Sequence, residues 1–177
     1  MQKRAKRVRM NQAGFTLVEL IIVIIILGIL AALAIPQFTT STTDAKEATL
    51  KANLAVLRNA INLYYHQHDS VYPGAVKEDG TGTATVAADN PNAFINQLTL
   101  YTDSTGKTST TKGALFPLGP YLESMPDNPL SKVGDDTDSA TVTADATTPV
   151  ADATAFGWKF SHVTGEIIAN NATYQAY

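Results

Sequence analysis

The chain has 177 residues, no cysteine and a formal net charge of -3, and its length fits one domain with an appendage. Five basic side chains, Lys3, Arg4, Lys6, Arg7 and Arg9, precede Gly14, so the remainder carries 8 positive and 16 negative side chains. This acidity disfavours nucleic acid as the main ligand, and the lack of cysteine excludes disulfides and thiolate metal sites.

Residues 15–35 form an apolar run in which Glu19 is the only charged side chain. A helix of this length is about 30 Å long, which matches the hydrocarbon core of a bilayer. Basic residues collect on the cytoplasmic side of a first membrane helix. The sequence therefore predicts a single-pass helix with the rest of the chain outside the cytoplasm.

Two general interpretations of this run are open. A plain signal anchor explains its length and the basic flank, but it leaves Glu19 unexplained. A secretory signal peptide explains the small residues Ala32-Leu33-Ala34, which resemble a cleavage site, although the run is long and Pro36 follows closely. Either interpretation leads to a secreted or membrane-anchored module that binds a ligand through its acidic part.

A third interpretation starts from residues 14–20, Gly-Phe-Thr-Leu-Val-Glu-Leu, which follow the basic leader and open the apolar run. This string resembles the class III signal of type IV pilins and type II secretion pseudopilins. The resemblance implies that a prepilin peptidase cuts between Gly14 and Phe15, removes residues 1–14 and methylates the new amine of Phe15. It also implies a structural subunit rather than an enzyme.

The same resemblance implies partners and a location. The subunit would polymerise with copies of itself and with minor pilins or pseudopilins, on an assembly platform in the inner membrane. Before assembly it would be held in that membrane by residues 15–36. After assembly it would lie in a pilus on the cell surface or in a periplasmic pseudopilus.

Glu19 is unfavourable inside a membrane, because placing a carboxylate in the apolar layer costs about 2.5–3.5 kcal/mol of free energy on insertion scales. Cleavage would create a partner for it, the ammonium of Phe15 on a neighbouring subunit. Such a pair adds little net stability, but either charge left alone costs several kcal/mol. We therefore expect the pair to set the register between subunits. The alternative is that Glu19 reaches toward the lipid head groups.

Gly28 and Pro36 weaken the helix, since glycine costs about 1 kcal/mol and proline about 3 kcal/mol in a helix interior. Both fall where the family often places such residues, and in related filaments this stretch loses helical structure on assembly. One prediction is that residues 28–36 unwind in the filament. The other is a simple kink.

Residues 37–70 change to an amphipathic pattern. Asp44 and Glu47 have the spacing of a capping signal and predict that a helix restarts there. Apolar side chains then recur at helical spacing on one face. They are Leu50, Leu54, Leu57, Ile61 and Tyr65. With residues 15–36 this segment predicts a long spine helix that ends near His68-Asp69.

Residues 71–177 predict a small globular part. A loop is expected over 77–89, a short helix beginning at Asn90-Pro91, and a second loop over 103–112. Residues 156–160 and 166–169 predict antiparallel strands around a turn at Thr164-Gly165, and one or two more strands are expected between 140 and 150. Packing of Trp158 or its neighbours on the spine helix gives an α+β fold with a small antiparallel sheet.

The segments Tyr64-Tyr65, Tyr72-Pro73, Tyr121-Leu122 and 126–129 (Pro-Asp-Asn-Pro) also resemble the major pseudopilins. Those proteins usually carry tryptophan and glycine directly after the last segment, whereas this chain has Leu130-Ser131. The departure concerns the subfamily only.

Few residues outside the apolar run suggest chemistry. Asp135, Asp136 and Asp138 are interpreted as a hydrated acidic loop. The alternative is a calcium site, because hard cations prefer clustered carboxylates. No other cofactor is expected. The sequence lacks the Gly-x-Ser-x-Gly, phosphate-loop and zinc motifs, and His66 and His68 are too close in sequence to share a ligand on a helix, so we expect no enzyme.

Overall fold

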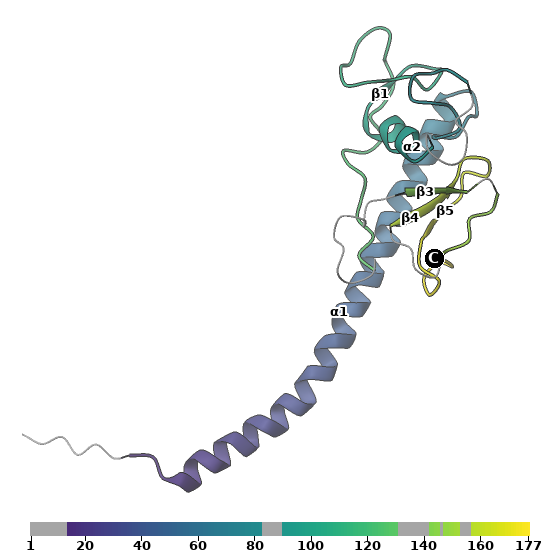
Figure 1. Cartoon of the computed structure of the whole chain (residues 1–177). Coiled ribbons are helices and arrows are strands. Elements are labelled where there is room, and N and C mark those ends of the chain that lie inside the picture. Colours follow the sequence, from purple (N-terminus) through teal and green to yellow (C-terminus); the bar gives the residue numbers. More distant parts are fainter. Residues whose placement is uncertain (1–13, 83–89, 131–141, 146, 153–156) are drawn as a thin grey trace, which may run out of the picture. The chain divides into compact units, whose positions relative to one another are not determined.

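The computed structural model describes residues 14–82, 90–130, 142–145, 147–152 and 157–177. The chain divides into two compact units, Met1–Thr43 and Asp44–Tyr177, and we call the second unit the head. Helix α1 (Leu17–Gln67) contributes residues to both units. The head adds helix α2 (Asn90–Thr99) and short strands, so the fold is α+β (Figure 1).

Helix α1 has 51 residues, which confirms the predicted spine helix. It ends at Gln67, followed by Asp69 and Ser70 with φ of 50° and 64°. The predicted restart at Asp44 and Glu47 is wrong, because α1 includes these residues without a break. A capping signal stabilises backbone N–H groups that lack helical partners, and within a helix those partners are already present.

Helix α2 begins at Asn90, as predicted, and ends before Tyr101, which lies in β1 (Tyr101–Thr102). Strand β1 pairs antiparallel with β2 (Thr108–Ser109), so the predicted loop over 103–112 contains a strand. The chain turns between the two strands where the Asp103 carboxylate accepts hydrogen bonds from the Thr105 and Lys107 amides, at 2.8 and 3.1 Å.

The C-terminal sheet has the order β3-β4-β5, formed by Val142–Asp145, Trp158–Ser161 and Ile167–Ala169. Strands β4 and β5 are antiparallel, as predicted, and β3 confirms a further strand between 140 and 150. However, β3 is parallel to β4, so the sheet is mixed rather than purely antiparallel. A parallel neighbour requires a connection that returns the chain to the same end of the sheet.

The core of the head lies between α1, α2 and this sheet. Leu54, Leu57 and Trp158 are at most 1% exposed and belong to one hydrophobic cluster, which confirms the predicted packing of Trp158. The rings of Phe94 and Phe160 join α2 to β4, with 4.2 Å between centroids. The prediction that Tyr65 lies on the buried face is wrong, and Tyr64 is buried instead. Tyr64 is three residues after Ile61, and positions three or four residues apart both lie on one helix face.

Residues 126–128 hold the sheet and α1 together through hydrogen bonds. The Trp158 indole donates to the Pro126 carbonyl at 2.7 Å, and the Asn53 amide donates to the Asp127 carbonyl at 2.8 Å. Buried Asn128 donates to the Gly157 carbonyl at 2.7 Å. The Pro-Asp-Asn segment noted in the sequence is thus a structural connector of the head.

Candidate functional site

The start of α1 is a reciprocal capping arrangement. Residues 14–16 are not helical, and the Thr16 hydroxyl accepts a hydrogen bond from the Glu19 amide at 3.2 Å. In return, Glu19 Oε2 accepts from the Thr16 amide and from the Thr16 hydroxyl, each at 2.8 Å. This is a capping box, in which two side chains satisfy backbone donors that the first helical turn leaves without partners.

Glu19 therefore has a role within its own chain that the sequence analysis missed. The signal was present, because a threonine followed three residues later by a glutamate, just before an apolar run, is the capping-box pattern. An ionised carboxylate has about four acceptor positions, so the contacts with Thr16 do not exhaust it. The arrangement orients the Glu19 carboxylate toward Thr16, at the N-terminal end of the helix.

The apolar side chains between residues 15 and 30 are exposed in the single chain. Their exposed fractions run from 41% at Ile21 to 85% at Phe15. They are Phe15, Leu17, Val18, Leu20, Ile21, Ile22, Val23, Ile24, Ile25, Ile26, Leu27, Ile29 and Leu30. Within the ranges that the structure describes, no helix reaches the combined length and hydropathy required to cross a bilayer.

Gly28 and Pro36 both lie inside α1. A Cβ placed on Gly28 would have no heavy atom within 4 Å apart from the backbone of its own helix turn. The side chain of Pro36 lies outside the described part of the chain. Residues 28–36 are helical in the single chain, and the two predictions for this stretch concern the filament, so both stay predictions.

Comparison with known proteins places these residues in a family. A family model described as the prokaryotic N-terminal methylation motif matches residues 9–35, which include Gly14, Phe15 and Glu19. The chain is also 32% identical over 105 residues to the type IV narrow pilus major component PilA5 of Thermus thermophilus, covering 59% of this chain and 82% of that protein. The chain belongs to the type IV pilin family. The resemblance expected from residues 14–20 is thereby confirmed.

Other members of the pilin family match shorter stretches. The type IV major pilin protein PilA of Myxococcus xanthus is 41% identical over 66 residues, 37% of this chain and 30% of that protein. The type II secretion system core protein G of Pseudomonas aeruginosa is 41% identical over 56 residues, 32% of this chain and 39% of that protein. The chain thus spans less than half the length of these two relatives. No solved structure gives a significant match.

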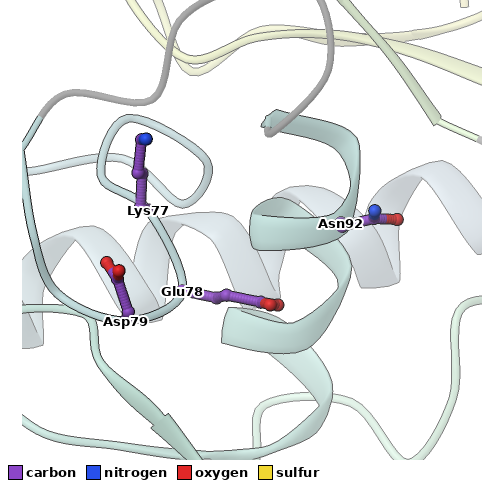
Figure 2. Close-up of a pocket in the computed structure, with 4 residues that line it drawn as sticks. All are labelled: Lys77, Glu78, Asp79 and Asn92. Atoms are coloured by element: carbon purple, nitrogen blue, oxygen red, sulfur yellow. The ribbon is translucent and has the colours of Figure 1, made fainter.

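The pilin head has a polar surface pocket of about 270 Å³. It is lined by Lys77, Glu78 and Asp79 of a loop and by Asn92 of α2 (Figure 2). Glu78 points toward α2, where its carboxylate accepts a hydrogen bond from the Asn96 amide, whereas Lys77 and Asn92 do not point toward each other. The charges in this pocket are mixed, and its side chains do not converge on one position.

Metal-binding groups do not come together in the described part of this pilin. Asp135, Asp136 and Asp138, the candidate calcium ligands, lie outside the described residues. Among the residues that are described, no group of three or more histidine, aspartate or glutamate side chains is placed to hold a metal ion. The hydrated acidic loop and its alternative, a calcium site, therefore both stay predictions.

The pilin head buries His68 at the end of α1, at 1% exposure. Its Nδ1 lies 2.9 Å from the Tyr64 carbonyl, which can only accept, so Nδ1 carries the proton and Nε2 accepts from the Thr102 hydroxyl at 3.0 Å. The ring also stacks on Tyr64, with 3.7 Å between centroids. Burial lowers the pKa of His68 and outweighs the opposing effects of the Tyr64 backbone, Asp103 and Asp69.

Proposed function

We propose that this chain is a structural subunit, a pilin or pseudopilin, that polymerises through residues 15–36. The observation that supports this most strongly is the helical run of exposed apolar side chains beginning at Phe15. Exposed apolar surface of this extent marks a membrane or protein contact. Membership of the type IV pilin family supports a contact with copies of the same chain.

In this proposal a prepilin peptidase cuts between Gly14 and Phe15 and methylates Phe15. The ammonium of Phe15 then pairs with Glu19 of a neighbouring subunit. The capping box is compatible with this pair, because Thr16 contacts only Oε2 of the carboxylate. A lone carboxylate in an apolar filament interior is unfavourable, so the pair selects the register of neighbouring subunits.

The proposal also assigns a sequence of locations and partners. Before assembly the subunit is held in the inner membrane by residues 15–36, with the head outside the cytoplasm. At an assembly platform in that membrane it joins its own copies and minor pilins or pseudopilins. The filament is a surface pilus or a periplasmic pseudopilus.

A second candidate function is a secreted or membrane-anchored module that binds a small polar ligand. The polar pocket beside α2 is the observation that favours it. This candidate requires a conventional signal peptide or anchor, so it predicts a mature chain that begins after Ala34 or retains its basic leader.

Mass spectrometry of the mature chain tests the proposal. We expect co-expression of the full chain with a prepilin peptidase to give a membrane-bound product that begins at Phe15 and carries one added methyl group. Gly14→Val should leave the chain uncut, because a branched side chain crowds the bond to be cleaved. Gln12→Ala, also in the leader, is the matched control and should be processed normally.

The alternative outcomes separate the candidates. A product beginning at Ile35 would overturn the proposal in favour of a secreted module. An uncut chain with an intact leader, in the presence of active peptidase, would favour a plain anchor.

A further inference from the structure

The C-terminal segment of the head, residues 171–177, folds back from strand β5 toward α1. It consists of two successive turns, in which the Tyr174 amide donates to the Asn171 carbonyl at 3.0 Å and the Tyr177 amide donates to the Tyr174 carbonyl at 3.3 Å. The Tyr174 side chain packs against the hydrophobic core. The segment is therefore anchored near its middle, and Tyr177 lies at its far end.

Tyr177 makes a separate contact with each of three charged side chains of α1. Its hydroxyl donates to Glu47 Oε2 at 3.0 Å, and its carbonyl accepts from Arg58 Nη1 at 2.9 Å. The Lys51 ammonium lies 4.1 Å from the centre of its ring, a cation–π contact. Glu47, Lys51 and Arg58 share one face of α1, over about 16 Å of helix.

Arg58 also joins this segment to the sheet. Its Nη2 donates to the Ile167 carbonyl of β5 at 3.3 Å, while Nη1 holds Tyr177. One guanidinium thus ties α1 to both the last strand and the segment that follows it. Arginine suits this position because its planar group presents several donors in a fixed geometry.

The contacts of Tyr177 require less free energy to break than the contacts of the core. They are polar contacts at the surface, and Tyr177 is 38% exposed, so water replaces each of them at low cost. The core beneath, by contrast, contains Leu54, Leu57 and Trp158 at most 1% exposed. Surface segments held in this way open locally, far below the free energy of global unfolding.

We propose that residues 171–177 are a reversible strap, pivoting at Tyr174, that closes over the Glu47–Arg58 face of α1 and opens while the core stays folded. Closed, the strap occupies the three charged side chains of α1 and covers Arg58 at the edge of β5. Open, it releases the contacts of Tyr177 with Glu47, Lys51 and Arg58. This inference concerns the head alone and stands whether or not the chain polymerises.

The contact between Tyr177 and Glu47 provides a direct test by amide hydrogen exchange on the full chain in detergent micelles. Tyr177→Phe removes the hydroxyl, and Glu47→Ala removes its acceptor. We expect each change to speed exchange of the Tyr177 amide about fivefold, since a net hydrogen bond contributes on the order of 1 kcal/mol. The Tyr121 and Leu122 amides, bonded to the Leu98 carbonyl in the core, should exchange at unchanged rates.

The double variant and a matched control sharpen the result. Tyr177→Phe combined with Glu47→Ala should be no faster than either single change, because both remove the same contact. Val163→Ala, which truncates an exposed side chain at the β4–β5 turn, should change nothing. The strap is refuted if the Tyr177 amide is unaffected in the single variants, or if it and the Leu122 amide accelerate by equal factors, which would make the opening global.

Discussion

The two halves of α1 carry apolar residues of the same kinds, but these side chains are buried in one half and exposed in the other. In the head, Leu50, Leu54 and Leu57 are at most 1% exposed, whereas Ile24 in the first unit is 57% exposed. The difference lies in the pattern. The head half has one apolar stripe, which its own chain covers, and the first half is apolar all round, which no single neighbour in the chain can cover. A helix that is apolar all round requires an apolar environment on every side.

The strongest test of this difference in burial is to truncate one apolar side chain to alanine in each half of α1. We expect Leu57→Ala to lower the free energy of unfolding of the head by about 2–5 kcal/mol, because it leaves a cavity in a closed core. Ile24→Ala should leave head stability unchanged within about 0.5 kcal/mol, because Ile24 belongs to the first unit and its side chain is largely exposed. The measurement is denaturant unfolding of the full chain in micelles, followed by the fluorescence of buried Trp158, the sole tryptophan.

In filament assays we expect Ile24→Ala, which has the smaller effect on head stability, to have a clear effect. Ile24→Ala should lower filament yield at normal subunit levels, since this side chain packs only in the assembled state under the proposed function. Equal losses of head stability in both variants would show that the two halves are not distinct in the way their burial indicates.

Acid pH should destabilise the head specifically, because the head contains the buried side chain of His68. Because burial lowers its pKa below the ordinary value of 6.5, the folded head favours the neutral ring. Its contribution to stability is thus fully present above pH 6.5 and is lost as the pH falls from there toward the lowered value. We expect the unfolding midpoint to fall over this window, by less than in Leu57→Ala, since one group is involved.

Histidine variants identify the source of this pH dependence. His68→Gln should flatten the profile between pH 6.5 and the range where carboxylates titrate. His66→Gln, at an exposed neighbouring position, should leave the profile unchanged. Partial burial also lowers the pKa of His162, so His162→Gln measures the remaining slope. A profile that His68→Gln does not alter would contradict the neutral assignment.

Local sequence patterns predicted the parts of the fold that depend on periodicity. The stripe from Leu50 to Ile61 predicted the packed half of α1, and Asn90-Pro91 predicted the start of α2. The alternation in residues 156–160 predicted β4, and the turn at Thr164-Gly165 predicted β5 after it. In each case the information lies within a few residues of the element. Residues 14–20 likewise predicted the family, because their signal is contiguous.

The missed features depend on contacts between distant residues. The parallel register of β3 with β4 pairs residues 16 positions apart along the chain, such as Val142 with Trp158. Gln97 is buried because its side chain accepts from the Gly74 amide and donates to the Gly106 and Val76 carbonyls, all in loops distant in sequence. The contact of Tyr177 with Glu47 spans 130 positions. No local sequence pattern predicts these contacts.

The smallest predicted effect concerns the first turn of α1, where capping and charge can be separated. Thr16→Ala removes the capping hydroxyl, which costs about 1 kcal/mol, and should speed amide exchange at residues 17–20 of the full chain in micelles about fivefold. Glu19→Gln keeps a side chain that completes a capping box but removes the charge, so exchange there should be nearly unchanged. Neither variant should alter the unfolding of the head, and Thr49→Ala, which removes a mid-helix hydroxyl bonded to the Ala45 carbonyl, is the control. In filaments the proposed function predicts the opposite order. Glu19→Gln should reduce assembly and Thr16→Ala should leave it near normal, because the proposed pair with the ammonium of a neighbouring subunit requires the charge and not the cap. Normal assembly of Glu19→Gln together with a defect in Thr16→Ala would reassign Glu19 from subunit register to the capping of its own helix.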